Sequence, residues 1–297
     1  MKKETLQNIV YSPLYLWFKL HAILPMRILY ILSDILYFPL YYIVHYRRKL
    51  VSENLRKAFP DKTDKELKQL EQKFYHHFCD YIVETIKLMH ISDEEMRRRM
   101  KFEQVEIIDR LFEENRSIII LLGHFGNWEW VPSVTLWTRT PDVMFAQIYR
   151  PLKNKWFDRS RFGSVCIAKQ DTLRAILQMK RSGKPSITGF MSDQTPSPTN
   201  IHHWARFLSQ DSPVLTGFEK IARKTDFAVL YFDVEIVKRG YYKTTIREIA
   251  LRPNELPEFE ITDRYTAIME KTILRNPWAW LWTHKRWKYK HEDFPGT

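Results

Sequence analysis

Short apolar runs alternate with helical patterns along the second two thirds of the chain. The apolar runs cover residues 117–122, 143–148, 186–190 and 227–237. Stretches with apolar residues at helical spacing cover residues 105–115, 130–138, 171–182 and 213–225. Because strands and helices alternate, we expect an α/β fold with a mainly parallel central sheet flanked by helices.

The flanks of this region predict further elements. Arg239-Gly240 is a turn signal between the last apolar run and residues 241–251, which predicts an antiparallel hairpin, and a helix is expected over residues 262–275. Thr63 and Ser92 each stand three residues before a glutamate, the spacing of a capping box. They predict helices over residues 64–90 and over a short stretch ending in the arginine run 97–99.

The N-terminal part predicts a membrane element. Residues 28–46 are almost wholly apolar or aromatic and are followed at once by three basic residues. Asp34 and Pro39 interrupt this run, so a tilted span, an interfacial helical hairpin and a buried helix of a soluble domain are all compatible with it. We expect a membrane anchor over residues 1–50 and one large domain over residues 51–297, with the body on the cytoplasmic side.

The composition favours some classes of binding partner but does not identify one of them. The 297 residues are 44% hydrophobic and can bury a full core, and the net charge of +12 favours acidic partners such as anionic lipid, nucleic acid or an acidic carrier protein. Cys79 and Cys166 lie far apart without a Cys-x-x-Cys spacing, which argues against a disulfide scaffold and structural zinc. His202 and His203 lack nearby ligands at metal spacing, so no metal site is expected.

The strongest chemical signal follows the run that ends at Leu122. The sequence there is Gly-His-Phe-Gly-Asn-Trp-Glu, residues 123–129, which places His124 in a loop at the carboxyl edge of the sheet, where open α/β folds bind ligands. We expect Asn127 to cap a helix whose first turn holds Glu129. The two glycines let His124 fold back onto Glu129, which would fix the imidazole tautomer while the other ring nitrogen takes a proton from a hydroxyl.

Several motifs in a fixed order carry a family resemblance. Besides residues 123–129 they are Asn-Leu-Arg-Lys-Ala-Phe-Pro at 54–60, Tyr-Arg-Pro at 149–151, Ser-Asp-Gln at 192–194 and Trp-Thr-His-Lys-Arg-Trp-Lys at 282–288. The chain resembles the bacterial late acyltransferases of lipid A biosynthesis, the lauroyl/myristoyl acyltransferase family. These belong to the wider glycerolipid acyltransferase group with its His-x4-Asp/Glu motif, and the likeness spans nearly the whole chain.

The resemblance implies a reaction and a location. Such enzymes move an acyl chain from an acyl carrier protein thioester to a hydroxyl of a lipid A precursor, in lipopolysaccharide biosynthesis on the cytoplasmic face of the inner membrane. No metal or bound cofactor is needed. By position, His124 is the general base and Glu129 its orienting partner. The further expected substrate-binding residues are Asn127, Arg150, Arg161 and Asp193, of which Arg150 is a candidate for phosphate or oxyanion contact.

Several alternatives stay open at this point. Residues 201–208 depart from the glycine-rich segment common in these enzymes, which keeps another glycolipid or an aminolipid open as acceptor. A non-catalytic lipid-binding protein and an acyl hydrolase are the other readings, and coenzyme A stays open as donor. The aromatic and basic residues 277–290 suit a membrane interface or the core, and no nucleic-acid module accompanies them, so nucleic-acid binding is not expected.

Overall fold

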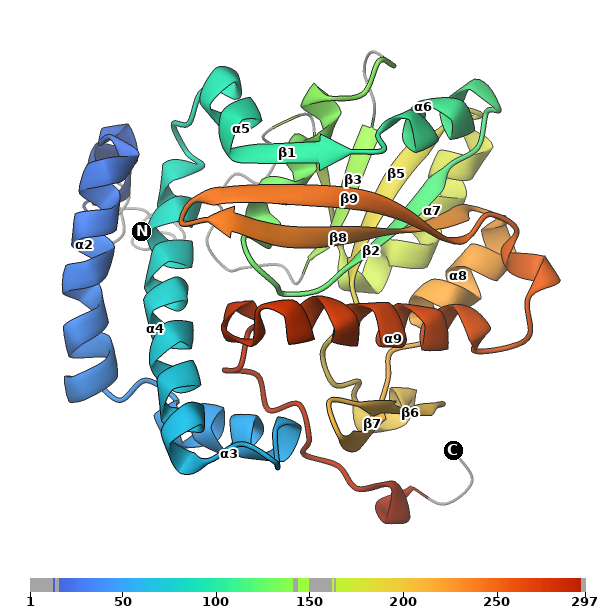
Figure 1. Cartoon of the computed structure of the whole chain (residues 1–297). Coiled ribbons are helices and arrows are strands. Elements are labelled where there is room, and N and C mark those ends of the chain that lie inside the picture. The colour runs from blue at the N-terminus through green and yellow to red at the C-terminus, as the bar shows by residue number, and fades with distance from the viewer. Residues whose placement is uncertain (1–12, 14–15, 141–143, 150–161, 163, 295–297) are drawn as a thin grey trace, which may run out of the picture.

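A seven-stranded sheet forms the centre of the computed structural model, which describes residues 13, 16–140, 144–149, 162 and 164–294 (Figure 1). Its strands are β1 (Met100–Glu103), β2 (Ile118–Leu122), β3 (Met144–Tyr149), β4 (Ser164–Ala168), β5 (Ser186–Met191), β8 (Ala228–Lys238) and β9 (Tyr241–Ala250). The order across the sheet is β1-β9-β8-β2-β5-β3-β4, and every neighbouring pair is parallel except β8 and β9. The predicted α/β class with a mainly parallel sheet is confirmed.

Most of the predicted elements occur where the apolar pattern places them. The four apolar runs form β2, β3, β5 and β8, and β9 returns beside β8 as the predicted antiparallel hairpin. Gly240 in the hairpin turn has a φ of +73°, a conformation that glycine adopts at little cost. The helices of this region are α6 (Glu106–Glu113), α7 (Thr172–Arg181), α8 (Gly217–Thr225) and α9 (Glu260–Arg275), and α9 lies against β8 and β9 (Figure 1).

The N-terminal third is helical and borders the β8–β9 turn. It contains α2 (Met26–Phe38), a π-helical turn (Pro39–Ile43), α3 (Arg48–Ala58), α4 (Asp64–Lys87) and α5 (Asp93–Arg99). The predicted capping box opens α4, because the Thr63 side chain accepts from the Glu66 N–H and the Glu66 carboxylate accepts from the Thr63 N–H. At the start of α5 the Ser92 hydroxyl accepts from the Glu95 N–H at 3.1 Å. Figure 1 shows α2 and α4 side by side.

Three details differ from the sequence-based expectation. The helix expected over residues 130–138 is a 3-10 helix, Trp128–Leu136, and contains Pro132, which has no N–H to donate to a regular α-helical ladder. The strands β1 and β4 and the small hairpin of β6 (Trp204–Phe207) and β7 (Gln210–Pro213) were not predicted. Pro213, the first residue of the expected helix 213–225, is the last residue of β7, and α8 begins only at Gly217.

Helix α2 has two contrasting faces. Toward α4 it makes polar contacts, in which Tyr30 donates to Glu84 at 2.8 Å and Ser33 donates to Asp80 at 2.6 Å. Away from α4 its large apolar side chains are exposed, among them Ile28, Ile31, Ile35 and Phe38. Among the described residues, the run Met26–Ile43 is long and apolar enough to cross a membrane by length and composition, and 28% of it is buried.

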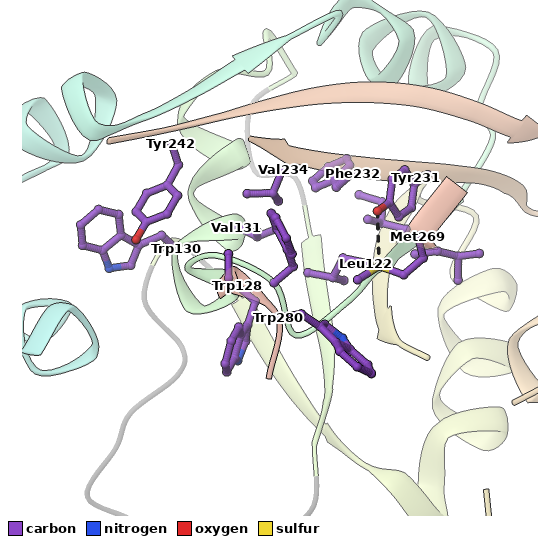
Figure 2. Packing of buried hydrophobic residues seen from close by; sticks show 14 of the residues in the cluster. Leu122, Trp128, Trp130, Val131, Tyr231, Phe232, Val234, Tyr242, Met269 and Trp280 are labelled. Carbon is purple, nitrogen blue, oxygen red and sulfur yellow. Dashed lines mark hydrogen bonds between the residues drawn. The ribbon is translucent and has the colours of Figure 1, made fainter. Parts of the chain in front are cut away.

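The core around β2 supports the residues that follow this strand. All five residues of β2 are buried. Figure 2 shows Leu122, the last of them, with Trp128 and Trp280 on one side and Phe232 and Val234 of β8 on the other. The loop after β2 therefore starts from a fixed point inside the core.

Candidate active site

His124 and Asp193 meet at the carboxyl edge of the sheet. β2 and β5 are parallel neighbours with Leu122 opposite Met191, and each of the two side chains follows two positions later. The Asp193 carboxylate lies 2.7 Å from His124 Nδ1 through Oδ1, and its Oδ2 accepts from the His124 backbone N–H at 2.9 Å. Trp280 Nε1 donates to the same Oδ2 at 2.7 Å. Three donors thus hold this carboxylate.

The charge of Asp193 decides the tautomer of His124. Burial by itself raises the pKa of this carboxyl, but the charge of His124 and the hydrogen bonds from His124 and Trp280 lower its pKa to about 2. An ionised carboxylate only accepts, so His124 Nδ1 carries the hydrogen and Nε2 is the atom that can take a proton. The imidazole is 15% exposed, and its Nε2 lies 3.3 Å from the Gln194 side-chain nitrogen.

Glu129 lies in the first turn of the 3-10 helix, as predicted. The Tyr81 hydroxyl donates to its Oε1 at 3.4 Å, and the Tyr81 ring stacks on Trp128 at 4.1 Å between centroids. The Trp128 ring in turn packs edge to face against His124 at 5.2 Å. Asp193 supplies the carboxylate bonded to His124 Nδ1. The role of Glu129 as the orienting partner stays a prediction.

Asn127 is fully buried and does not cap the helix with its side chain, contrary to the expectation. Its amide donates instead to Glu84 Oε2 at 2.7 Å, and this oxygen also accepts from the Tyr242 hydroxyl at 2.8 Å. Together with Tyr30 on the other oxygen, three donors surround a carboxylate with no exposed surface. Burial raises the pKa of Glu84 to about 7, although these hydrogen bonds oppose the shift.

Glu84 was not singled out in the sequence. It stands in the last turn of the amphipathic helix α4, and its partners lie 43 to 158 positions away. Through its hydrogen bond with Asn127, Glu84 holds the loop that carries His124 against α4. The predicted contact of Asn127 with substrate stays a prediction.

The two glycines of the loop have different tasks. Gly126 has a φ of +60°, and its N–H donates to the Ala279 carbonyl at 3.0 Å. Gly123 permits a close approach, since a Cβ there would lie 2.2 Å from the Met269 Cε. The His124 carbonyl accepts from the Leu281 N–H at 3.0 Å, so the C-terminal segment binds the loop at two points.

An apolar cavity adjoins Glu129 and Trp128. Its walls come from the ends of β2, β3 and β5 and from the 3-10 helix, and they comprise Leu122, Trp128, Glu129, Val131, Pro132, Phe145, Gln147, Ile148, Gly189 and Met191. Arg150 and Arg161 lie outside the described residues. Their expected roles stay predictions.

The C-terminal aromatic residues mostly pack on the core. Trp280 and Trp282 are buried, and Trp280 contributes the hydrogen bond to Asp193. In the segment that departs from the resemblance, His203 Nε2 lies 2.7 Å from Asp263 Oδ1, and its ring stacks on Phe259. These contacts anchor His203 to the start of α9.

Comparison with known proteins gives consistent matches. The family model described as bacterial lipid A biosynthesis acyltransferase matches residues 4–289. The chain is 21% identical to the lipid A biosynthesis lauroyltransferase of Escherichia coli (strain K12) over 259 residues, covering 84% of this chain and 81% of that protein. It is 24% identical to lipid A biosynthesis acyltransferase 2 of Shigella flexneri over 140 residues, covering 46% of this chain and 44% of that protein.

Proposed function

The chain belongs to the bacterial lipid A biosynthesis acyltransferase family, and on that premise we propose that it transfers an acyl chain from an acyl carrier protein thioester to a hydroxyl of a lipid A precursor. The family supports acyl transfer in lipid A biosynthesis; the donor, the acceptor hydroxyl and the residue roles are our proposal. The observation that carries it is the buried Asp193 carboxylate on His124 Nδ1, because it leaves Nε2 ready to accept a proton.

His124 acts as the general base in the proposed reaction. Its Nε2 removes the proton of the acceptor hydroxyl while the hydroxyl oxygen attacks the thioester carbonyl carbon, forming the new C–O bond. The tetrahedral intermediate then collapses, the C–S bond breaks, and the leaving sulfur takes the proton from the imidazolium. Asp193 stabilises the imidazolium between these two transfers, as the buried aspartate does in serine hydrolases.

Glu129 is the second carboxylate of the proposal. It lies at the boundary between the apolar cavity and Tyr81, and the Trp128 ring separates Tyr81 from His124. We assign it to the orientation of the reacting groups beside His124. The cavity behind it takes the first carbons of the acyl chain, since its lining is mostly apolar.

The acyl donor is an acyl carrier protein in this proposal. The net charge of +12 steers an acidic carrier toward the enzyme. Because salt screens this attraction, we expect association with the carrier to slow as the salt concentration rises. Coenzyme A thioesters serve as the comparison substrate. A carrier-dependent enzyme uses them with a much lower kcat/KM.

Membrane attachment is part of the proposal as well. The exposed apolar face of α2, with Ile31 and Ile35, enters the inner membrane from its cytoplasmic side, while the opposite face stays bound to α4. This arrangement brings the site to the bilayer surface, from which a lipid acceptor reaches it. The boundary between an anchor at residues 1–50 and the domain that follows remains a prediction.

Mass spectrometry of lipids tests the proposed function. Membranes with the wild-type protein or with His124→Ala or Glu129→Ala are incubated with acyl carrier protein thioester and a tetra-acylated lipid A precursor. We expect a gain of one acyl chain with the wild type and its loss in both variants. His203→Ala is the matched control, because it removes another histidine that is bound to an aspartate.

Other outcomes would point to the alternatives. Free fatty acid without an acylated lipid indicates a hydrolase, and acylation of an aminolipid in preference to the precursor changes the acceptor class. Membrane binding without turnover of any thioester rejects the enzyme and favours a lipid-binding protein.

A further inference from the structure

One face of helix α4 contacts the chain just after His124. His77, Tyr81 and Glu84 stand four and three positions apart, a spacing that puts their side chains on one face of the helix. Each of the three hydrogen-bonds a residue of the segment 126–129. The position of this segment is therefore set in part by α4.

Glu84 is the most firmly fixed of the three residues. Its side chain is fully buried, and its Oε2 accepts from the Asn127 amide at 2.7 Å. The Glu84 carbonyl also accepts from Trp130 Nε1 at 3.3 Å, so that one residue of α4 holds two residues of the segment after β2. The carboxylate itself accepts from the hydroxyls of Tyr30 on α2 and Tyr242 on β9, at 2.8 Å each. Glu84 thus ties this segment to α2, α4 and β9.

Asn127 connects Glu84 to the groups that border the imidazole. The next residue, Trp128, packs its ring edge to face against His124 at 5.2 Å, and Glu129 follows it. A shift of the backbone at Asn127 would move the Trp128 ring and the Glu129 carboxylate relative to His124. In an active site, a displacement of about 1 Å can lower the rate by about 100-fold.

We propose that Glu84 is a positioning residue for the acyl transfer, which acts through Asn127 on the groups that border His124. The inference rests on the proposed function and adds a residue on which its rate depends. The Glu84 carboxylate has no exposed surface and is surrounded by donors of the protein, so it does not itself contact the substrate. Its effect is therefore expected in kcat, whereas the loss of a substrate contact of equal strength in ground and transition state raises KM.

Three variants of the full-length protein test this link in transfer kinetics. Glu84→Leu removes the acceptor at similar side-chain volume. Asn127→Ala removes the donor, and the two tyrosine hydroxyls still satisfy Glu84. For each variant we expect kcat to fall by about 10- to 100-fold, with KM changed by less than about threefold. Glu84→Gln is expected to keep kcat close to that of the wild type, because its amide oxygen can accept from Asn127 and its amide nitrogen can donate to the Tyr30 oxygen.

A double-mutant cycle shows whether Glu84 acts through Asn127. If it does, Glu84→Leu/Asn127→Ala loses no more kcat than Glu84→Leu alone, whereas independent effects multiply. Glu219→Leu is the matched control, because Glu219 on α8 is also a buried carboxylate, but it accepts from Phe259 and Thr262 around the start of α9. This control is expected to lose stability and to keep the wild-type kcat in its folded fraction.

Hydrogen exchange examines the same link without turnover. The N–H groups of Gly126 and Trp130 donate to backbone carbonyls at 3.0 and 3.3 Å, so peptides that contain them report on this segment. We expect their exchange to become about 10-fold faster in Glu84→Leu and in Asn127→Ala, the factor of one lost hydrogen bond. In Glu84→Gln it is expected to stay close to the wild-type rate.

Several results would overturn the inference. One is an unchanged kcat in folded Asn127→Ala protein, which keeps the test decisive even if Glu84→Leu does not fold. Another is a loss confined to KM, which would assign Asn127 to substrate binding, and a third is losses of kcat that multiply in the double variant. If the wild-type protein transfers no acyl chain to any acceptor, the proposed function is rejected, and unchanged hydrogen exchange in the variants would then show separately that Glu84 does not fix the segment.

Discussion

Asp193→Asn is the sharpest test of the proposed base. Oδ2 of Asp193 accepts from two donors, the His124 N–H and Trp280 Nε1, so the amide oxygen of the variant takes this place. The amide nitrogen then faces His124 Nδ1, which must act as acceptor, and the ring hydrogen moves to Nε2. The base is lost while two of the three hydrogen bonds remain. In serine proteases the equivalent change lowers kcat by ~10⁴-fold, and we expect kcat/KM to fall by about 10³- to 10⁴-fold here.

The assay follows transfer of a labelled acyl chain from the carrier protein to the lipid A precursor. A decrease by this factor corresponds to about 4–5.5 kcal/mol of transition-state stabilisation. Asp263→Asn is the control, because it alters another aspartate at 2.7 Å from a histidine, on the exposed side of α9. Less than a tenfold loss in folded Asp193→Asn protein would refute the assignment of His124 Nε2 as the base.

Three further predictions concern the surroundings of the site. The pKa of Glu84 is raised from 4.5 to about 7. Between these pH values the folded protein holds a proton that the unfolded chain has released. The free energy of unfolding therefore falls with rising pH, by up to about 3 kcal/mol. Glu84→Gln is expected to remove this pH dependence, which is measured by denaturant titrations at pH 5 and 7.5. An equal change in the free energy of unfolding between the two pH values in the variant contradicts the prediction. Gly126→Ala forces a side chain into a φ of +60° and is expected to cost about 1–3 kcal/mol of stability and to lower kcat, as denaturation and turnover assays show. Ile31→Lys and Ile35→Lys are expected to weaken binding in liposome flotation by at least tenfold each, whereas Leu274→Lys on α9 leaves it unchanged.

The fold was predictable where strands are buried and continuous. Residues 117–122 read as a strand because all five residues of β2 are apolar and buried. β1 and β4 escaped notice since they are short, and β1 alternates between buried and exposed positions. The 3-10 geometry of Trp128–Leu136 depends on packing around Pro132, which a periodic pattern does not encode.

The sequence singled out His124 and Asp193 separately, but it did not predict their contact. The motif around His124 indicated the proposed base, and the resemblance brought in Asp193. Their contact depends on the adjacency of β2 and β5, which join residues 69 positions apart, whereas the nearby Glu129 was the partner that local spacing suggested. His124 and Asp193 each follow the last residue of an apolar strand by two positions. This shared spacing is a signal that could have linked them.

The polar contacts of α2 also set an order of assembly. Helix α2 leaves the ribosome long before its partner Arg239, which follows Asp34 by 205 residues. At 5–20 residues per second, this gap corresponds to roughly 10–40 s of synthesis. In the proposed membrane-attached protein, the apolar face of α2 can settle at the bilayer during that time, while its inner face meets α4 first and the β8–β9 turn last. The enzyme would then close onto a helix that is already in place, and a chain started after residue 50 would leave Asp80 and Glu84 buried without their α2 donors.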